Sequence, residues 1–292
     1  MAARKWTVLE AVPPAAAYLS RRGVENPRLD AELLLAGVLR LKRLDLYLQF
    51  DRPLAPAEQA NFRARLERRG RREPLQYVEG RASFRNLDLR VDRRVLIPRP
   101  ETERLVEEVL RYAAGRQGLA VLDVCTGSGA IALSLASEGR FHRVVATDCS
   151  RDALRVAGAN AREAGLNDKV ELGHGDLFDP LGAGERFDVI VSNPPYVAEA
   201  DRATLPPEVV GWEPAEALFA GDDGLAVIRR LVSEAPRHLL PGGLLALEAG
   251  LGQHEQVAAL ARGVPGYKEP VILPDLTGRQ RFVLIEYREG RK

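Results

Sequence analysis

Cysteine is scarce in this sequence, and long apolar runs are missing. The 292 residues include two cysteines, Cys125 and Cys149, which do not form a CxxC pair. Neither a zinc site nor a disulfide scaffold is therefore expected, and we predict no bound metal. No apolar stretch reaches the roughly 18 residues that a membrane-spanning helix needs. Because Glu10 and two prolines interrupt the first apolar stretch, it does not read as a secretory signal, and we expect a cytoplasmic protein without a membrane partner.

Net charge is also small, at +1, but it is unevenly distributed. Residues 1–75 contain 15 Lys and Arg against 9 Asp and Glu, whereas the remainder contains 27 against 32. The basic part is either a docking surface for an acidic macromolecule or a solvated helix surface with scattered arginines. Its aromatic residues are spread out, which favours core positions over a nucleic-acid groove. Among them are Trp6, Tyr18, Tyr47 and Phe50.

The first part of the chain is predicted to be helical, because its apolar residues recur at helical spacing. The four predicted helices cover residues 7–21, 27–39, 43–48 and 55–72. Between Tyr77 and Ile97 apolar and polar residues alternate instead, which predicts a β-hairpin. We therefore expect a helical domain over residues 1–75, a β-hairpin linker over 76–97 and a further domain over 98–292.

From Pro98 onward strands alternate with helices, which is typical of a mainly parallel sheet. The predicted helices cover residues 128–137, 151–164, 225–238 and 253–261. The predicted strands cover residues 120–124, 143–147, 169–172, 187–191, 244–249, 267–273 and 281–287. The last two strands are so close in sequence that an antiparallel pair is favoured. The fold class is thus α/β, with a seven-stranded, mostly parallel sheet and an antiparallel end, as in class I methyltransferases.

The fourth strand leads into a stiff polar loop, Asn193-Pro194-Pro195-Tyr196. Two consecutive prolines hold φ near −65° and cannot donate hydrogen bonds, so the directions of the loop's carbonyls are set in advance. The Asn193 side chain and the Pro194 carbonyl can accept both hydrogens of a planar NH2 group, and the Tyr196 ring can stack on it. The alternative is a loop whose prolines simply end a strand.

A glycine-rich turn joins the first strand to its helix. Two glycines, Gly127 and Gly129, let the backbone approach a ligand, and the helix amino end exposes free N–H groups. Such a turn also opens dehydrogenase and nucleotide-binding folds. The predicted cofactor contacts within the turn are Asp123, Cys125, Thr126, Gly127, Ser128 and Gly129.

Acidic residues follow the next two strands. Asp148 is placed to accept both ribose hydroxyls of a nucleoside, Asp176 to accept from an adenine amine, and Leu177 to pack on the adenine face. Each acid alone could equally be a loop or helix-capping residue. Their order at successive strand ends favours a cofactor site, which would also include Asn193.

These motifs, taken together, resemble the release factor N5-glutamine methyltransferases, the HemK or PrmC family. The resemblance covers essentially the whole chain. It is carried by Glu73–Tyr77, by Leu96–Glu103 (LIPRPETE), by Thr126–Ala132, by Asn193–Tyr196, and by Glu213-Pro214 with Gly224-Leu225. The IPRPETE stretch is more specific than NPPY, which DNA and RNA adenine methyltransferases share.

The resemblance implies methyl transfer from S-adenosyl-L-methionine to the glutamine side chain in the Gly-Gly-Gln tip of peptide chain release factors. It implies that Asn193, Pro194 and Tyr196 are catalytic. We also expect a monomer with no direct nucleic-acid target. The residues expected to contact the substrate are Asn193, Pro194, Pro195, Tyr196, Arg99, Pro100 and Glu101.

The sequence departs from the family pattern at two positions. Cys125 stands where the family's loop commonly has its first glycine, so we expect cofactor binding to survive if φ at Cys125 is negative. Leu177 stands where the family sometimes has an aromatic residue, so the adenine contact would be apolar packing without stacking. Cys125 and Cys149 follow neighbouring strands, and we expect modification of this pair to block the cofactor, the alternative being that both are buried small hydrophobes.

Three rival functions stay open from the sequence. An N6-adenine methyltransferase would use the same NH2 clamp but would need a nucleic-acid groove with interleaved aromatics. A nicotinamide oxidoreductase would use the glycine turn and leave the NPPY loop without a role. A docking module that kept a cofactor fold would not need an intact NPPY loop.

Overall fold

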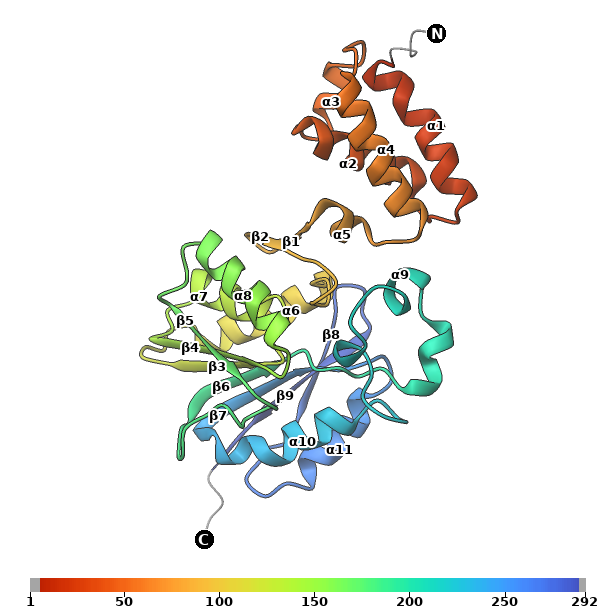
Figure 1. Ribbon diagram of the computed structural model, residues 1–292. Coiled ribbons are helices and arrows are strands. Elements are labelled where there is room, and N and C mark those ends of the chain that lie inside the picture. Colours follow the sequence, from red (N-terminus) through yellow and green to blue (C-terminus); the bar gives the residue numbers. More distant parts are fainter. Residues whose placement is uncertain (1–5, 289–292) are drawn as a thin grey trace. The chain divides into compact units, whose positions relative to one another are not determined.

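The computed structural model describes residues 6–288, which form two compact units (Figure 1). One unit comprises the residues up to Gly80 together with Pro206–Trp212. The other comprises Arg81–Leu205 and the residues from Glu213 onward. The predicted domain boundaries missed the return of the chain to the first unit at Pro206–Trp212.

The first unit is a helical bundle. Thr7 caps its first helix, because the Thr7 hydroxyl accepts from the Glu10 backbone N–H at 3.3 Å while the Glu10 carboxylate accepts from the Thr7 N–H at 3.0 Å. Leu19, Leu34 and Phe62 pack in its core. All four predicted helices are confirmed, and two short ones are added. The helices are α1 (Val8–Arg21), α2 (Pro27–Leu39), α3 (Asp45–Leu48), α4 (Pro56–Gly70), α5 (Leu75–Glu79) and α9 (Pro207–Val210).

Several basic side chains of this unit form ion pairs within it. Arg69 is buried and contacts Asp30 at 2.7 Å and Glu208 at 3.0 Å, and Arg72 contacts the same Glu208 at 2.6 Å. Arg68 pairs with Glu73 at 2.6 Å. Much of the positive charge at the end of α4 is therefore paired with acids of the same unit. Fewer arginines than the composition suggested are left to bind an acidic partner.

The aromatic residues of this unit are less buried than predicted. Trp6 and Tyr18 pack against the core and are partly buried, but Tyr47 and Phe50 are 45% and 52% exposed. Leu44 and Leu48 nearby are also exposed. The prediction that all four aromatics are core residues is thus wrong for Tyr47, which lies in the short helix α3, and for Phe50, which follows it.

The β-hairpin is shorter than predicted and belongs to the second unit. Its strands are β1 (Arg81–Phe84) and β2 (Leu87–Arg90), and helix α5 occupies the residues before it. The Asn160 side chain accepts from the Arg90 N–H at 2.8 Å and donates to the Arg90 carbonyl at 3.1 Å and to the Ser128 carbonyl at 2.9 Å. One amide therefore ties the hairpin to the glycine-rich turn.

The second unit is built on a seven-stranded sheet in the order β5-β4-β3-β6-β7-β9-β8. The pairs from β5 to β7 are parallel, and β9 pairs antiparallel with both β7 and β8, which confirms the predicted antiparallel end. The strands are β3 (Ala120–Val124), β4 (Arg143–Asp148), β5 (Val170–His174), β6 (Phe187–Ser192), β7 (Leu239–Glu248), β8 (Val271–Pro274) and β9 (Gln280–Glu286).

Helices cover both faces of this sheet (Figure 1). One core lies under α6, α7 and α8, and the other lies under α10 and α11. The central strand β6 is buried on both sides, since Val189, Ile190 and Val191 are all inaccessible to solvent. The α-helices are α6 (Pro100–Ala113), α7 (Ala130–Glu138), α8 (Arg151–Glu163), α10 (Ala226–Glu234) and α11 (His254–Arg262), and the 3₁₀ helices are η1 (Glu199–Thr204), η2 (Ala215–Ala217) and η3 (Ala235–Arg237).

Two features are absent from residues 6–288. None of the helices there is long and apolar enough to cross a bilayer. Nor does that part of the chain contain a group of three or more His, Cys, Asp or Glu side chains arranged to hold a metal ion.

Replacing Asn160 with alanine should destabilise the second unit. The change leaves the N–H and C=O of Arg90 and the C=O of Ser128 without their partner, so we expect Asn160→Ala to lower the free energy of unfolding by about 2 to 4 kcal/mol. Urea unfolding of the variant measures this. Asn167→Ala is the matched control, because Asn167 is exposed and, among the described residues, its side chain hydrogen-bonds only to its neighbour Asp168. Equal midpoints for both variants would contradict the bridging role.

Candidate active site

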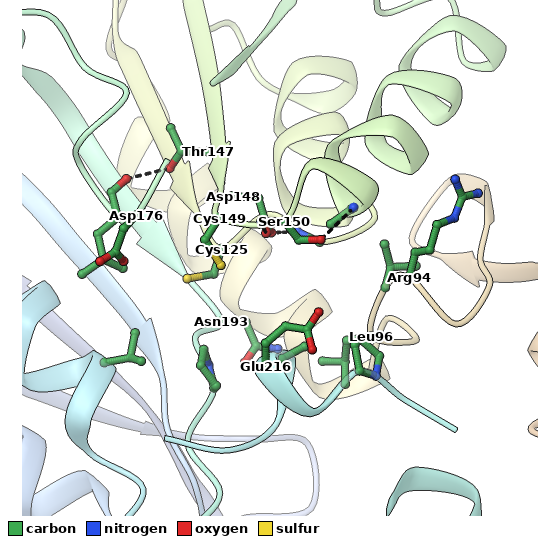
Figure 2. Close-up of a pocket in the computed structure, with 18 residues that line it drawn as sticks. Arg94, Leu96, Cys125, Thr147, Asp148, Cys149, Ser150, Asp176, Asn193 and Glu216 are labelled. Carbon is green, nitrogen blue, oxygen red and sulfur yellow. Dashed lines mark hydrogen bonds between the residues drawn. The ribbon is translucent and has the colours of Figure 1, made fainter. Parts of the chain in front are cut away.

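A pocket opens beyond the carboxyl ends of β3, β4 and β6 (Figure 2). Parallel strands bring these ends to one edge of the sheet, so residues far apart in sequence meet there. Seven predicted site residues line it, namely Cys125, Gly127, Asp148, Asp176, Leu177, Asn193 and Pro195. The other lining residues are Arg94, Val95, Leu96, Thr147, Cys149, Ser150, Ala153, Pro214, Glu216, Ala217 and Val227.

The glycine-rich turn has three residues with positive φ. Cys125 has a φ of +62°, Gly127 of +56° and Gly129 of +85°. The expectation of a negative φ at Cys125 is therefore wrong. The cysteine keeps the left-handed conformation that glycine adopts freely, at a cost of about 1 to 2 kcal/mol for a residue with a Cβ. Cys125 lines the pocket in this conformation.

Asp123 lies beneath the turn and does not line the pocket. It is fully buried, and its Oδ2 accepts from the Thr126 hydroxyl at 2.6 Å and from the Ala132 N–H at 3.1 Å. Its Oδ1 has no hydrogen-bond partner in the described part of the chain, and burial raises the pKa of Asp123 to about 7. We predicted a cofactor contact for Asp123; the structure gives it the role of holding the turn.

The rest of the turn is held through its backbone. The Thr126 N–H donates to the Thr147 carbonyl at 3.0 Å, the Ser128 carbonyl accepts from Asn160, and Gly129 begins helix α7. Thr126 and Ser128 are buried. Of the predicted contacts in this turn, Cys125 and Gly127 line the pocket. Thr126, Ser128 and Gly129 do not line it, and their cofactor contacts stay predictions.

Asp148 lies at the end of β4 and braces two segments of the pocket wall. Its Oδ2 accepts from the Gly127 N–H and its Oδ1 from the Ser150 N–H, both at 2.8 Å. Burial raises the pKa of Asp148, and these two backbone hydrogen bonds oppose the rise. A carboxylate has about four acceptor positions, so each oxygen can still accept from a ligand hydroxyl.

Asp176 and Leu177 form the wall beyond β5. The Asp176 side chain is 53% exposed and its Oδ2 pairs with Arg230 Nη1 at 2.7 Å, so this acid has a partner of its own. Leu177 is buried, has a φ of +47°, and its carbonyl accepts from the Thr147 hydroxyl at 3.1 Å. The Leu177 side chain gives the wall an apolar surface together with Val227.

The NPPY loop continues from β6 into the pocket wall. Pro194 and Pro195 are buried, and Asn193 lines the pocket (Figure 2). The Asn193 Nδ2 donates to the Thr102 hydroxyl at 3.1 Å. The Tyr196 hydroxyl donates to Glu248 Oε1 at 3.3 Å, and burial raises the pKa of Tyr196.

The backbone carbonyl of Tyr196 is held by Gln253 and lies close to Gly224. This carbonyl accepts from the Gln253 side chain at 2.9 Å. A Cβ on Gly224 would lie 2.2 Å from this carbonyl oxygen, and Gly224 has a φ of +73°. Only glycine therefore fits at position 224 without moving the loop.

The three residues of the IPRPETE stretch that we predicted to contact the substrate do not line the pocket. Arg99 Nη2 pairs with the buried carboxylate of Glu213 at 2.6 Å, which also accepts from the Ile97 N–H at 3.3 Å. Pro100 is exposed and Glu101 is partly buried in the first turn of α6. Arg99, Pro100 and Glu101 do not line the pocket, so their substrate contacts stay predictions.

Comparisons with known proteins identify the family. A release factor glutamine methyltransferase of Geobacter sulfurreducens is 46% identical to this chain, covering 87% of this chain and 88% of its own length. One of Moorella thermoacetica is 44% identical, covering 97% and 99%. The chain belongs to the release factor glutamine methyltransferase family. Models of the PrmC N-terminal domain and of the methyltransferase small domain match residues 10–80 and 102–209 of this family member.

Solved structures bear out the fold. A methyltransferase from Pyrococcus furiosus has a TM-score of 0.52 and 23% identity over 70% of this chain and 90% of its own. An rRNA methyltransferase of Thermus thermophilus, solved with S-adenosylmethionine and guanosine, has a TM-score of 0.51 and 21% identity over 71% of this chain and 50% of its own. At these identities the likeness concerns the fold, which is the predicted class I methyltransferase fold.

Several residues of the site in this family member were not found from the sequence. Glu213-Pro214 was part of the resemblance, but nothing in its spacing pointed to Arg99 or to the pocket wall. Glu216 follows in a 3₁₀ helix with no periodic signal. Thr102 and Glu248 contact the NPPY loop from two distant segments, α6 and β7.

Gly224→Ala should disorganise the NPPY loop. The added methyl group would collide with the Tyr196 carbonyl, and the alanine would have to keep the positive φ of Gly224. We therefore expect a loss of about 2 kcal/mol or more in the free energy of unfolding, together with loss of activity. Gly221→Ala is the matched control, since Gly221 has a φ of +79° but its Cβ would lie 3.5 Å from the nearest atom. Urea unfolding compares the two, and equal losses would show that the contact with Tyr196 is unimportant.

Thiol labelling should report on the pocket. Cys125 and Cys149 both line it, and burial raises the pKa of both thiols, so labelling at neutral pH should be slow. Cys149 is exposed and should react first. We expect S-adenosylhomocysteine to slow labelling further, as measured by mass spectrometry over time. Identical rates with and without it would place the ligand elsewhere.

Proposed function

We propose that this protein transfers a methyl group from S-adenosylmethionine to the side-chain amide nitrogen, N5, of the glutamine in the Gly-Gly-Gln motif of peptide chain release factors. The observation that carries the proposal is the position of Asn193, which lines the same pocket as Asp148 and Leu177. An acceptor suited to a planar NH2 group thus borders a pocket suited to a nucleoside. Family membership supports the same substrate.

The pocket residues fit the proposed cofactor. The oxygens of Asp148 have acceptor positions left for ribose hydroxyls, and Leu177 and Val227 supply an apolar surface for adenine. No atom lies within 4 Å of where a Cβ would stand on Gly127, which leaves room for a ligand against the backbone. Asp176 would have to share its carboxylate with Arg230 to accept from an adenine amine. When bound, S-adenosylmethionine supplies an electrophilic methyl group.

The residues of the NPPY loop would act mainly by orientation. An amide nitrogen is a weak nucleophile because its lone pair is delocalised into the carbonyl. Two acceptors, the Asn193 side-chain oxygen and the Pro194 carbonyl, can hold both amide hydrogens and direct the nitrogen along one axis. Correct orientation can contribute several kcal/mol to lowering the barrier. These hydrogen bonds strengthen as positive charge develops on the nitrogen.

No general base is assigned within the pocket. Of the four histidines of the chain, all within the described residues, none lines the pocket. Methyl transfer leaves a positively charged amide nitrogen with an acidic proton, which water can take up, so no basic side chain is required. The histidines are His142, His174, His238 and His254.

The helical unit is proposed to bind the release factor. Its exposed apolar side chains Leu44, Tyr47, Leu48 and Phe50 offer contact area that a protein partner would cover. We also propose that the enzyme acts as a monomer in the cytoplasm and takes no nucleic acid as its target.

The decisive assay uses purified protein, labelled S-adenosylmethionine and a release factor. We expect label on the wild-type release factor and none on its Gly-Gly-Gln variant in which the glutamine is replaced by alanine. Asn193→Ala should lower kcat on the order of 100-fold while S-adenosylhomocysteine affinity stays within a few-fold, because the lost contact belongs to the amide. Asp148→Ala should instead weaken S-adenosylhomocysteine binding by roughly 1.5 to 3 kcal/mol.

The two variants are controls for each other. If Asn193→Ala retains full activity, the NH2 clamp is wrong. If Asp148→Ala leaves the calorimetric affinity for S-adenosylhomocysteine unchanged, the ribose contact lies elsewhere. Label on the glutamine-free release factor, or on added RNA or DNA instead, would refute the proposed substrate.

A further inference from the structure

A chain of three hydrogen bonds runs beneath the NPPY loop, and its innermost group is a buried acid. Glu248 ends strand β7 and is 1% exposed. Its Oε2 accepts from the Thr102 hydroxyl at 2.7 Å, and its Oε1 accepts from the Tyr196 hydroxyl at 3.3 Å. The Thr102 oxygen in turn lies 3.1 Å from Asn193 Nδ2. Two residues of the NPPY loop are thus connected to one carboxylate.

We propose that Thr102 and Glu248 are positioning residues that fix which end of the Asn193 amide faces the pocket. The proposal rests on the proposed function, in which Asn193 must offer its oxygen to the NH2 group of the substrate glutamine. An asparagine side chain can turn over by rotation, and it then presents an NH2 group of its own. That orientation would repel the substrate amide and abolish the acceptor.

The direction of the hydrogen-bond chain follows from the chemistry of its members. Glu248 is ionised at a pH above its pKa of about 7, and an ionised carboxylate only accepts hydrogen bonds. In that form it commits the single proton of the Thr102 hydroxyl to the hydrogen bond with Glu248. The Thr102 oxygen can therefore only accept from its other partner. Asn193 has one donor group, Nδ2, and this group must turn toward Thr102, which leaves Oδ1 free. Among the described residues no hydrogen bond to Asn193 Oδ1 is found.

The surroundings of Glu248 set its pKa, and so the fraction of Glu248 that is ionised and can only accept hydrogen bonds. Burial raises the pKa of Glu248 to about 7, while the hydrogen bond from Thr102 and the charge of Arg281 oppose the rise. Arg281 comes from β9, and Glu101 of α6 adds a negative charge that raises the pKa further. The Asn193 acceptor is thus oriented by Thr102 of α6 and Glu248 of β7, which lie outside the NPPY loop, while Arg281 of β9 acts only on the charge state of Glu248.

Replacing Glu248 with glutamine keeps the shape of the side chain but no longer fixes which group of the hydrogen-bond chain donates and which accepts. In Glu248→Gln the new NH2 group can donate to Thr102, which frees the threonine proton for the Asn193 oxygen and lets the amide turn over. Thr102→Val removes the hydroxyl and keeps the shape of the side chain. Thr102→Ser keeps the hydroxyl and should restore the chain.

Steady-state kinetics with the release factor test the proposal. We expect Thr102→Val and Glu248→Gln each to lower kcat by about 10- to 100-fold, because misoriented groups cost this much without any loss of cofactor binding. Calorimetric affinity for S-adenosylhomocysteine should stay unchanged, and Thr102→Ser should be close to wild type. The double variant should be little worse than either single one, since both changes break the same chain.

Ser134→Ala is the matched control for loss of a buried hydroxyl. Ser134 lies in α7, is fully buried, and its oxygen has no hydrogen-bond partner in the described part of the chain. This variant should keep wild-type kcat. Wild-type kcat in both Thr102→Val and Glu248→Gln would overturn the proposal. Equal losses in Thr102→Ser and Thr102→Val would also overturn it, because the hydroxyl would then have no special role.

A measurement without substrate separates this inference from the proposed function. The side-chain NH2 signal of Asn193, assigned by its loss in Asn193→Ala, should exchange slowly with solvent in the wild-type protein and faster in Thr102→Val. Slow exchange in both would overturn the inference even in an active enzyme. If the wild-type enzyme fails to methylate the release factor while the exchange rates differ as expected, the proposed substrate is wrong and the orientation of Asn193 stands.

Discussion

Two buried carboxylates hold the loops on which this site depends. Asp123 lies under the glycine-rich turn and Glu248 under the NPPY loop, and each accepts hydrogen bonds from the loop above it. Burying a charged carboxylate costs free energy unless it is hydrogen-bonded. Moving either loop away would remove those hydrogen bonds, so the buried acid favours the observed loop conformation. Both acids come from interior strands of the sheet, Asp123 from β3 and Glu248 from β7, so loops made of glycine and proline are anchored to the sheet itself.

This arrangement lowers stability at neutral pH. Burial raises the pKa of both acids to about 7, from ordinary values of 3.8 for Asp123 and 4.5 for Glu248. The folded protein therefore binds these protons more tightly than the unfolded chain. Folding becomes less favourable as the pH rises from about 4 to about 7, and the contribution of protonation is lost above that. Such costs are typical of functional sites.

The sheet could be predicted from sequence far more completely than the site. Strand β3 was predicted at its observed bounds, because a short, mostly apolar run next to a glycine-rich turn is typical of a buried strand. The site depends on details that periodicity does not contain. Whether Asp123 faces the pocket or the turn is decided by its hydrogen bonds to Thr126 and Ala132, and the pairing of Arg99 with Glu213 joins residues 114 positions apart. The left-handed conformation of Cys125 is imposed by the turn against the preference of the residue.

The excursion of Pro206–Trp212 into the helical unit changes what the domain boundary means. The chain passes between the two units after Gly80, again after Leu205 and again after Trp212, so three covalent crossings join them. Truncation at residue 80 would therefore not release an intact catalytic unit. It would leave Glu208 without Arg69 and Arg72 and expose a segment that begins ten residues after Tyr196. The two units therefore cannot be separated by a cut at a single point of the chain, because part of one is encoded inside the other.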